Sequence, residues 1–251
     1  MRWTLPSQEF EALWFSTGRD RMPYPTRHKP PTMAWADELR RYRSAAVESL
    51  TRRLNEPLVE ALSILDKPVV RLDVNGRSGD DLATPIRIYC GIGDSSAVFV
   101  QQLPDPTPDA TGDFELTLCR PADIAKFVVG ALPEASPGTR EAIKIARADL
   151  ELDPELDGRM YADSAEDKIN RMFDRKRSSL GEISVFAGPI LDNSHTAGGL
   201  GFFWMDFTGD GRYIVTNGKV VSARPADAQF LAGTIDQLAR QLRERATVSQ
   251  R

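Results

Sequence analysis

Apolar residues recur at helical spacing in the first part of the chain. EFEALWF lies between Ser7 and Gly18 and has the pattern of a short helix with a polar N-terminal cap and a glycine stop. The stretch at 18–32 is rich in proline and cannot be regular helix. After it, apolar positions three and four residues apart predict a long helix that begins near Trp35 and resumes after Pro57 as LVEALSIL. We therefore expect a short helix followed by a helical hairpin or a kinked long helix.

From residue 68 onward the apolar pattern takes the period of β-strands. VVRLDV, IRIYC, AVFVQQL and FELTL alternate or run apolar over strand lengths, and a helical pattern, PADIAKFVVGAL, follows them. After Pro137 a second series contains EDKINRMFDRKRSSL, which predicts a helix with an apolar side that extends to Leu180. Strand patterns follow at EISVF, LGFFWMDF, RYIVT and KVVSA, and Asn217-Gly218 joins the last two as a hairpin turn. KIARADLEL, before this second helix, fits either a strand or a linker.

The two halves share an element order and a tetrapeptide. Each contains a helix, four strands and a closing helix, and in each RPAD connects the last strand to that helix, at 120–123 and at 224–227. Proline at the first helical position lacks only an N–H that would be unpaired there, and aspartate two residues later can cap free amides. We interpret RPAD as a strand-to-helix turn without a catalytic role. The shared order predicts one domain built of two pseudo-symmetric halves, about 1–136 and 137–251.

Charge and composition argue against several classes of function. The 251 residues carry a net charge of −4 with a pI near 5.4, whereas a nucleic-acid-binding protein needs a basic excess. No apolar run is long enough for a signal peptide or for a membrane span. Cys90, Cys119, His28 and His195 have no spacing typical of a zinc site. We expect a cytoplasmic protein without metal or cofactor, and with neither nucleic acid nor a membrane as its partner.

Candidate catalytic and metal-binding motifs are weak. Asp192, Ser194 and His195 would have to form a triad from neighbouring loop positions, and no GxSxG elbow accompanies them. DFTGDGRYIVTN resembles a calcium loop in part, but strands flank it and Asn217 stands where a glutamate should close the site. A polar loop and a hairpin turn are the better interpretations. We assign no catalytic and no metal-binding residue.

The most unusual stretch is LGFFWMDF at 200–207, which would place large apolar side chains on both faces of a strand. Either it is a central strand covered on both sides, or one face awaits a partner. An aromatic patch around an isolated charge is typical of interaction hot spots. On the second interpretation, the candidate partner-binding residues, chosen by strand alternation, are Phe202, Trp204, Asp206 and Arg212.

Both ends of the chain resemble the EspG family, the secretion-associated proteins of actinobacterial type VII (ESX) systems. The similar segments are FEALWFSTGRDRMPYPTR at the start and GRYIVTNGKVVSARPADAQFLAGTIDQLA at the end, and the likeness in element order extends over essentially the whole chain. The resemblance implies a quasi-two-fold α+β fold with a central antiparallel sheet and two helical bundles. It also implies a partner-binding region on the sheet and the C-terminal helical bundle.

The function implied by the resemblance involves no catalysis. It is that of a cytosolic chaperone that binds PE–PPE heterodimers at the apolar helical tip of the PPE subunit, keeps them soluble and directs them to one secretion system. The expected complex is 1:1:1, and the free protein is expected to be a monomer or a weak homodimer. The alternative is a small-molecule enzyme or sensor with a pocket between the two halves. Convergent polar groups with shifted pKa values in such a pocket would support that alternative.

Overall fold

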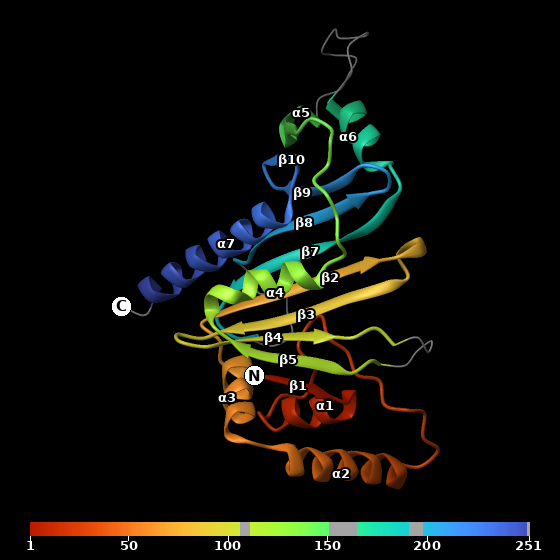
Figure 1. Ribbon diagram of the computed structural model, residues 1–251, viewed down its shortest axis with the longest axis vertical. Coiled ribbons are helices and arrows are strands. Elements are labelled where there is room, and N and C mark those ends of the chain that lie inside the picture. Colours follow the sequence, from red (N-terminus) through yellow and green to blue (C-terminus); the bar gives the residue numbers. More distant parts are fainter. Residues whose placement is uncertain (106–110, 151–164, 191–197, 250–251) are drawn as a thin grey trace.

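The fold is one antiparallel sheet with helices at both ends and along one face (Figure 1). The computed structural model describes residues 1–105, 111–150, 165–190 and 198–249. The strands are β1 (Arg2–Leu5), β2 (Val70–Ser78), β3 (Thr84–Ile92), β4 (Ala97–Gln102), β5 (Phe114–Cys119), β6 (Ile143–Ala146), β7 (Arg177–Ala187), β8 (Leu200–Phe207), β9 (Gly211–Asn217) and β10 (Val220–Pro225). The helices are α1 (Ser7–Phe15), α2 (Ala36–Arg53), α3 (Glu56–Asp66), α4 (Ile124–Ala131), α5 (Arg147–Leu150), α6 (Ala165–Phe173) and α7 (Ala228–Ser249), with 3₁₀ turns η1 (Asp80–Leu82) and η2 (Pro121–Asp123).

The strand order is the same from the centre of the sheet to either edge. The described strands follow the order β1-β5-β4-β3-β2-β7-β8-β9-β10-β6. β2 and β7 pair antiparallel at the centre, from Val70 opposite Ala187 to Ser78 opposite Ser179. Outward from this seam, β3, β4, β5 and β1 correspond in order to β8, β9, β10 and β6. The predicted quasi-two-fold α+β fold around an antiparallel sheet is confirmed, while the boundary between the halves near residue 136 stays a prediction.

Helices α4 and α7 cover one face of the sheet (Figure 1). Ile88 and Cys90 of β3 are buried beneath them in one cluster with Val128 of α4 and Leu231 of α7. Tyr89, between those two strand residues, belongs to a second cluster with α1 and α3. Because successive side chains of a strand point to opposite faces, α1 and α3 cover the other face.

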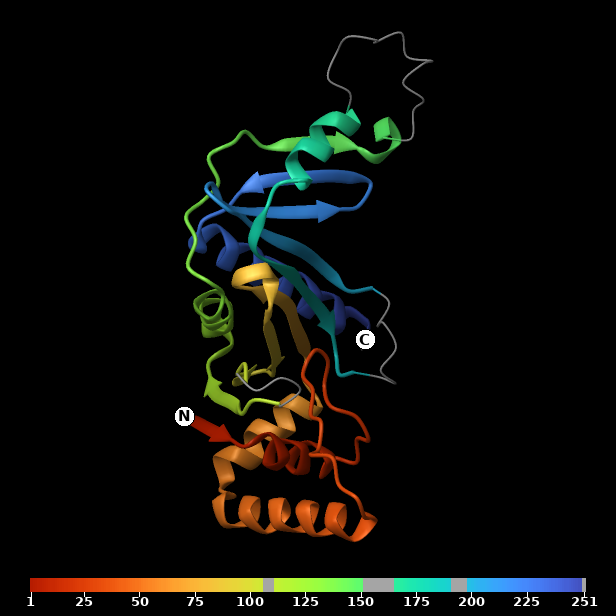
Figure 2. The same cartoon turned by 90° about the vertical axis from the view of Figure 1, so that its right-hand side faces the viewer.

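The same second face is covered by α6 at the far end of the sheet. Met172 and Phe173 of α6 pack with Tyr213 and Val215 of β9 in a third, smaller cluster. Figure 2 shows α1, α2 and α3 at one end of the molecule and α5 and α6 at the other. Among the described residues, neither the second nor the third cluster takes a residue from β2 or β7. Helices therefore leave the middle of this face uncovered.

The two RPAD segments form strand-to-helix corners in different ways. Pro121 opens the 3₁₀ turn η2 as predicted, and Arg120 Nε donates to Asp123 Oδ2 at 2.9 Å. Pro225, by contrast, is still part of β10, opposite Tyr213. Its helix starts later, where the Asp227 carboxylate accepts the Phe230 N–H at 2.7 Å as an N-terminal cap. The corner is shared, but only the first proline occupies the predicted helical position.

Three predicted elements are adjusted by the structure. The long helix divides into α2 and α3 at Asn55, whose side chain accepts the Leu58 N–H at 3.0 Å. The predicted second-half helix ends at Phe173, and Leu180 lies in β7 because that strand pairs with both β2 and β8. KIARADLEL begins as β6 and continues into α5, and its last two residues lie outside the described part of the chain. The β8–β9 and β9–β10 hairpins form where the sequence predicts them.

Candidate partner-binding face

The four residues predicted to bind a partner lie inside the protein. Phe202 and Trp204 of β8 are 3% and 0% exposed and belong to the cluster under α4 and α7. Asp206 and Arg212 are 3% and 2% exposed. A partner cannot contact these side chains in this conformation, so the prediction that they form an exposed docking surface is corrected. The strand alternation is right, but the even positions of β8 face the core.

Trp204 fills a space left by two glycines at the centre of the sheet. Gly76 of β2 lies opposite Gly181 of β7, and Gly181 lies opposite Trp204. A Cβ atom at Gly76 would lie 2.4 Å from Cη2 of the indole, and one at Gly181 would lie 2.1 Å from it. The indole N–H donates to Ser179 Oγ at 3.0 Å. Trp204 therefore packs the second half of the sheet onto the seam and contributes to the core.

Asp206 and Arg212 form a buried ion pair between β8 and β9. Nε and Nη2 of Arg212 each donate to one carboxylate oxygen of Asp206 at 2.7 Å. Nη2 also donates to the Pro133 carbonyl at 2.6 Å, and the Arg212 N–H donates to the Ser136 carbonyl at 2.8 Å. A bidentate pair with further hydrogen bonds offsets much of the cost of burying two charges. The pair anchors the segment after α4 to the β8–β9 hairpin.

The opposite face of β8 is accessible in the middle of the sheet. Phe203 and Met205 are partly exposed, and they lie opposite Glu182 and Leu180 of β7. On the next strand, β2, an exposed Asn75 lies opposite Glu182 and an exposed Arg77 lies opposite Leu180. These side chains share one face because paired positions on neighbouring strands point the same way. We call this surface the open face; its residues are Asn75, Arg77, Leu180, Glu182, Phe203 and Met205.

The open face combines an apolar part with a polar border. Leu180, Phe203 and Met205 supply the apolar part, next to the small cluster that α6 covers. At the border, Asn75 Nδ2 donates to the hydroxyl of the exposed Tyr24 at 2.8 Å. The connector between α1 and α2 therefore reaches one side of the face. An apolar centre with a polar rim is the usual anatomy of a protein interface.

A second accessible apolar surface lies on the N-terminal helices. A groove of about 560 Å³ runs between α1, α2 and α3. Val47, Leu54 and Val59 line it and are 52%, 43% and 50% exposed. This groove is separate from the open face, because its lining residues come from the helices at the end of the molecule.

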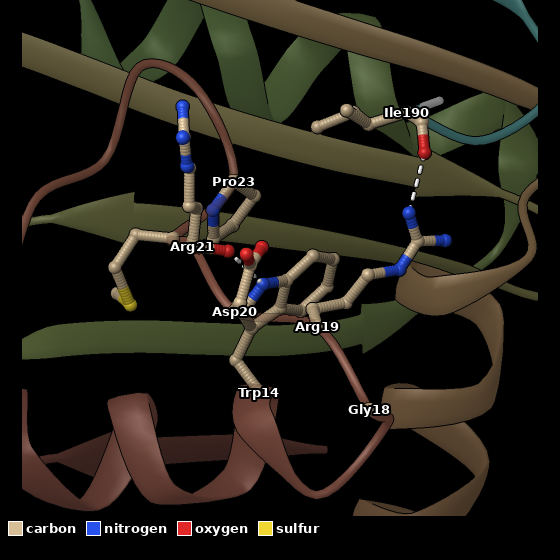
Figure 3. Close-up of a pocket in the computed structure, with 8 residues that line it drawn as sticks. Trp14, Gly18, Arg19, Asp20, Arg21, Pro23 and Ile190 are labelled. Atoms are coloured by element: carbon tan, nitrogen blue, oxygen red, sulfur yellow. Dashed lines mark hydrogen bonds between the residues drawn. The ribbon is translucent and has the colours of Figure 1, made fainter. Parts of the chain in front are cut away.

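The GRDR segment lines a small polar pocket of about 390 Å³ (Figure 3). Arg19 Nε donates to Asp66 Oδ1 at 3.1 Å, and its Nη1 reaches the Ile190 carbonyl at 2.5 Å. Trp14 Nε1 donates to the Arg21 carbonyl at 2.7 Å, while the Arg21 side chain points away from Arg19. These contacts hold the connector after α1 against α3 and the end of β7. Serine, cysteine, histidine and lysine are not among the residues that line the pocket.

The carboxyl groups of Asp73 and Asp210 have shifted pKa values and lie outside that pocket. Burial raises the pKa of Asp73 to about 7, although Arg71, with Nε 3.3 Å from Oδ2, opposes the shift. Burial also raises the pKa of Asp210, but hydrogen bonds from groups that include Thr139 and Arg175 outweigh it and hold that pKa well below its usual range. Asp210 is in the β8–β9 turn, and its carboxylate accepts a hydrogen bond from the Thr139 hydroxyl. It therefore has a structural role at this hairpin. Neither carboxyl group lines the polar pocket at the GRDR segment. Neither is therefore placed for acid–base catalysis there.

The comparisons with known proteins decide the family. A family model described as ESX-1_EspG, EspG family, matches residues 6–237. The chain belongs to the EspG family. The match includes all of FEALWFSTGRDRMPYPTR and all but the last two residues of the closing stretch from GRYIVT onward, the two segments that carry the resemblance in the sequence. A comparison with curated proteins found no match.

A solved EspG structure has the same fold. It is the Mycobacterium tuberculosis type VII secretion system chaperone EspG5 in complex with the PE25–PPE41 dimer. The match has a TM-score of 0.58 and 13% sequence identity, and it covers 96% of each chain. At 13% identity this likeness establishes the fold alone. The two proteins share that fold over almost their whole length.

The EspG family is a family of secretion chaperones, so membership in it supports a chaperone and not an enzyme. The catalytic alternative, Asp192, Ser194 and His195, lies outside the described residues. In the described part of the chain, no helix has the length and apolar character needed to cross a bilayer.

Sequence analysis found the strand that carries the open face, but the residues of β8 that it selected lie on the covered side of that strand. LGFFWMDF is apolar on both sides, so alternation alone does not tell which side is covered. Leu180 was missed because the helical pattern before it extends through this position. One available signal was the pair Gly76 and Gly181, since glycine inside a strand often marks the close approach of another group. That signal identifies the side on which Trp204 packs.

Proposed function

We propose that this EspG protein binds a PE–PPE heterodimer through the apolar helical tip of its PPE subunit, keeps the pair soluble and directs it to its ESX secretion system. The observation that carries the proposal is family membership over residues 6–237, together with the shared fold of EspG5, which was solved in complex with a PE25–PPE41 dimer. The expected complex contains one copy of each of the three chains. Its chaperone action would consist of covering an apolar surface that otherwise aggregates.

The open face is the proposed contact surface. It replaces Phe202, Trp204, Asp206 and Arg212, which are buried. Leu180, Phe203 and Met205 supply apolar area on the strand whose covered side holds the earlier candidates. The uncovered middle of the sheet lies between two groups of helices, which could both border a docked helical tip (Figure 2). A standard interface of about 1,600 Å² extends beyond these residues onto both borders.

The experiment is co-expression with the PE–PPE pair encoded nearest to this gene. We expect a soluble complex that elutes as one species with 1:1:1 stoichiometry by light scattering. Leu180→Glu and Met205→Glu should each weaken binding by about tenfold or more, because a carboxylate would be buried against an apolar partner. Binding is measured by titration calorimetry with the purified pair.

Val59→Glu is the matched control, because it places the same charge on the exposed apolar groove between α1, α2 and α3. It should leave the affinity unchanged. If Val59→Glu abolishes binding and the open-face variants do not, the contact surface is the groove. If no PE–PPE pair from the same genome co-purifies, the proposed function itself is wrong.

A further inference from the structure

Three arginines lie side by side at one edge of the open face. Arg77 of β2 is exposed, and Arg87 of β3 is partly exposed. Arg87 lies opposite Asn75, and Asn75 is two residues before Arg77 on β2, so the two arginines are diagonal neighbours. Diagonal neighbours of this kind are about 7–8 Å apart on the same face of a sheet. The backbone of Arg27 is fixed beside them, since its N–H donates to Gln102 Oε1 at 3.0 Å and its carbonyl accepts from Gln102 Nε2 at 2.7 Å.

Gln102 connects the third arginine to the other two. It lies opposite Arg87 in the β3–β4 ladder, and it is buried on the side of β4 that also carries Val100 of the second cluster. Arg27 is exposed at this position. We call Arg27, Arg77 and Arg87 the arginine cluster.

The arginine cluster has no direct acidic partner within the described part of the chain. No ion pair there involves Arg27, Arg77 or Arg87, and the hydrogen bond from Arg77 goes to a backbone carbonyl, that of Leu82, at 3.4 Å. Burial lowers the pKa of Arg87, and the nearby charges of Arg27 and Arg77 lower it further. The three guanidinium groups therefore lie close enough to repel one another, and Glu182, diagonal to Arg77 on the open face, forms no ion pair with them.

Two arginines near the other end of the sheet, by contrast, are paired with acids. Arg212 is bound to Asp206, and Arg175 Nη2 is 2.5 Å from Asp210 Oδ2. The acid of the open face, Glu182, lies opposite Asn75 and accepts a hydrogen bond from Ser184 Oγ at 2.7 Å. The arginine cluster therefore lies at the edge of an accessible apolar surface without an ion pair of the kind that holds Arg212 and Arg175.

We propose that the arginine cluster binds carboxylate side chains that flank the apolar tip of the helical client. This rests on the proposed function, and it assigns the selection of acidic over neutral or basic tips to Arg27, Arg77 and Arg87. Leu180 lies directly opposite Arg77, so an apolar contact and a cation adjoin on neighbouring strands. An amphipathic helical tip with Asp or Glu beside its apolar residues matches both. Guanidinium groups bind carboxylates in a two-pronged geometry, and complementary charge favours specificity and rapid association.

The test is a charge reversal in the full-length protein, with the PE–PPE pair encoded nearest to the gene as the probe. The double variant Arg77→Glu/Arg87→Glu should bind that heterodimer at least about tenfold more weakly than wild type. Its association rate should fall less steeply with added salt, because screening acts on the charges that steer encounter. Arg77→Glu alone, at an exposed position, should show part of both effects and keeps the test valid if Arg87→Glu impairs folding.

The matched control is Arg40→Glu/Arg52→Glu on α2, which changes the net charge equally at two exposed positions. It should bind like wild type. Replacing the acidic residues of the client tip by lysine should restore binding to the cluster variant. If wild type binds the heterodimer but the cluster variants match the control, the arginine cluster has no role in recognition and the proposed function stands. If wild type does not bind the heterodimer, the proposed function fails first.

Discussion

Trp204 is the residue on which the centre of the sheet depends. Its indole lies over Gly76 and Gly181 and is fully buried, so Trp204→Ala would leave a cavity that the glycines cannot fill. We expect a loss of about 3–5 kcal/mol in the free energy of unfolding, measured by urea denaturation. Trp204→Arg should prevent folding, because it buries a charge without a partner.

Phe203→Ala is the comparison for Trp204, because it removes an aromatic ring from the adjacent, partly exposed position. It should cost markedly less stability. A folded Trp204→Ala protein with an unchanged unfolding midpoint would show that the indole is not a core residue. The contrast between positions 203 and 204 thus measures which side of the strand is covered.

At the level of elements, the sequence predicts type and order well and boundaries less well. The strands are recognisable because their apolar period of two persists even where they pair on both sides. The predicted helix that extends to Leu180 fails after Phe173, because β7 forms backbone ladders with β2 and β8 that no local pattern records. For the same reason the open face could not be chosen in advance: whether Phe202 or Phe203 is covered depends on where α4 and α7 pack.

The β8–β9 hairpin and the segment after α4 are held together by Asp206 and Arg212. Removing one partner, as in Asp206→Leu, leaves a buried charge unpaired and should cost about 3–5 kcal/mol in unfolding free energy. The double variant Asp206→Leu/Arg212→Met should cost less than either single change, because no buried charge remains. Urea midpoints of the four proteins form a double-mutant cycle. Strictly additive losses would contradict a direct interaction.

The whole molecule is organised around the seam between β2 and β7. The largest cluster contains residues of both halves, among them Val74 and Ile88 from the first and Trp204 and Leu231 from the second. Each half on its own would expose its share of this cluster and the unpaired edge of a central strand. We therefore expect the two halves to form one cooperative unit, with the open face spanning the seam.

This organisation predicts how the separated halves behave. Expressed alone, residues 1–136 and residues 137–251 should each aggregate or remain unfolded, since the seam supplies the missing partner for both. Expressed together, they should reassemble through β2 and β7 into a soluble one-to-one complex with the circular dichroism of the intact chain. A pair cut between Leu116 and Thr117, inside β5, is the control and should not reassemble, because the cut divides a strand that pairs with β4 and β1. A half that is monomeric and unfolds cooperatively by itself would instead identify two independent domains.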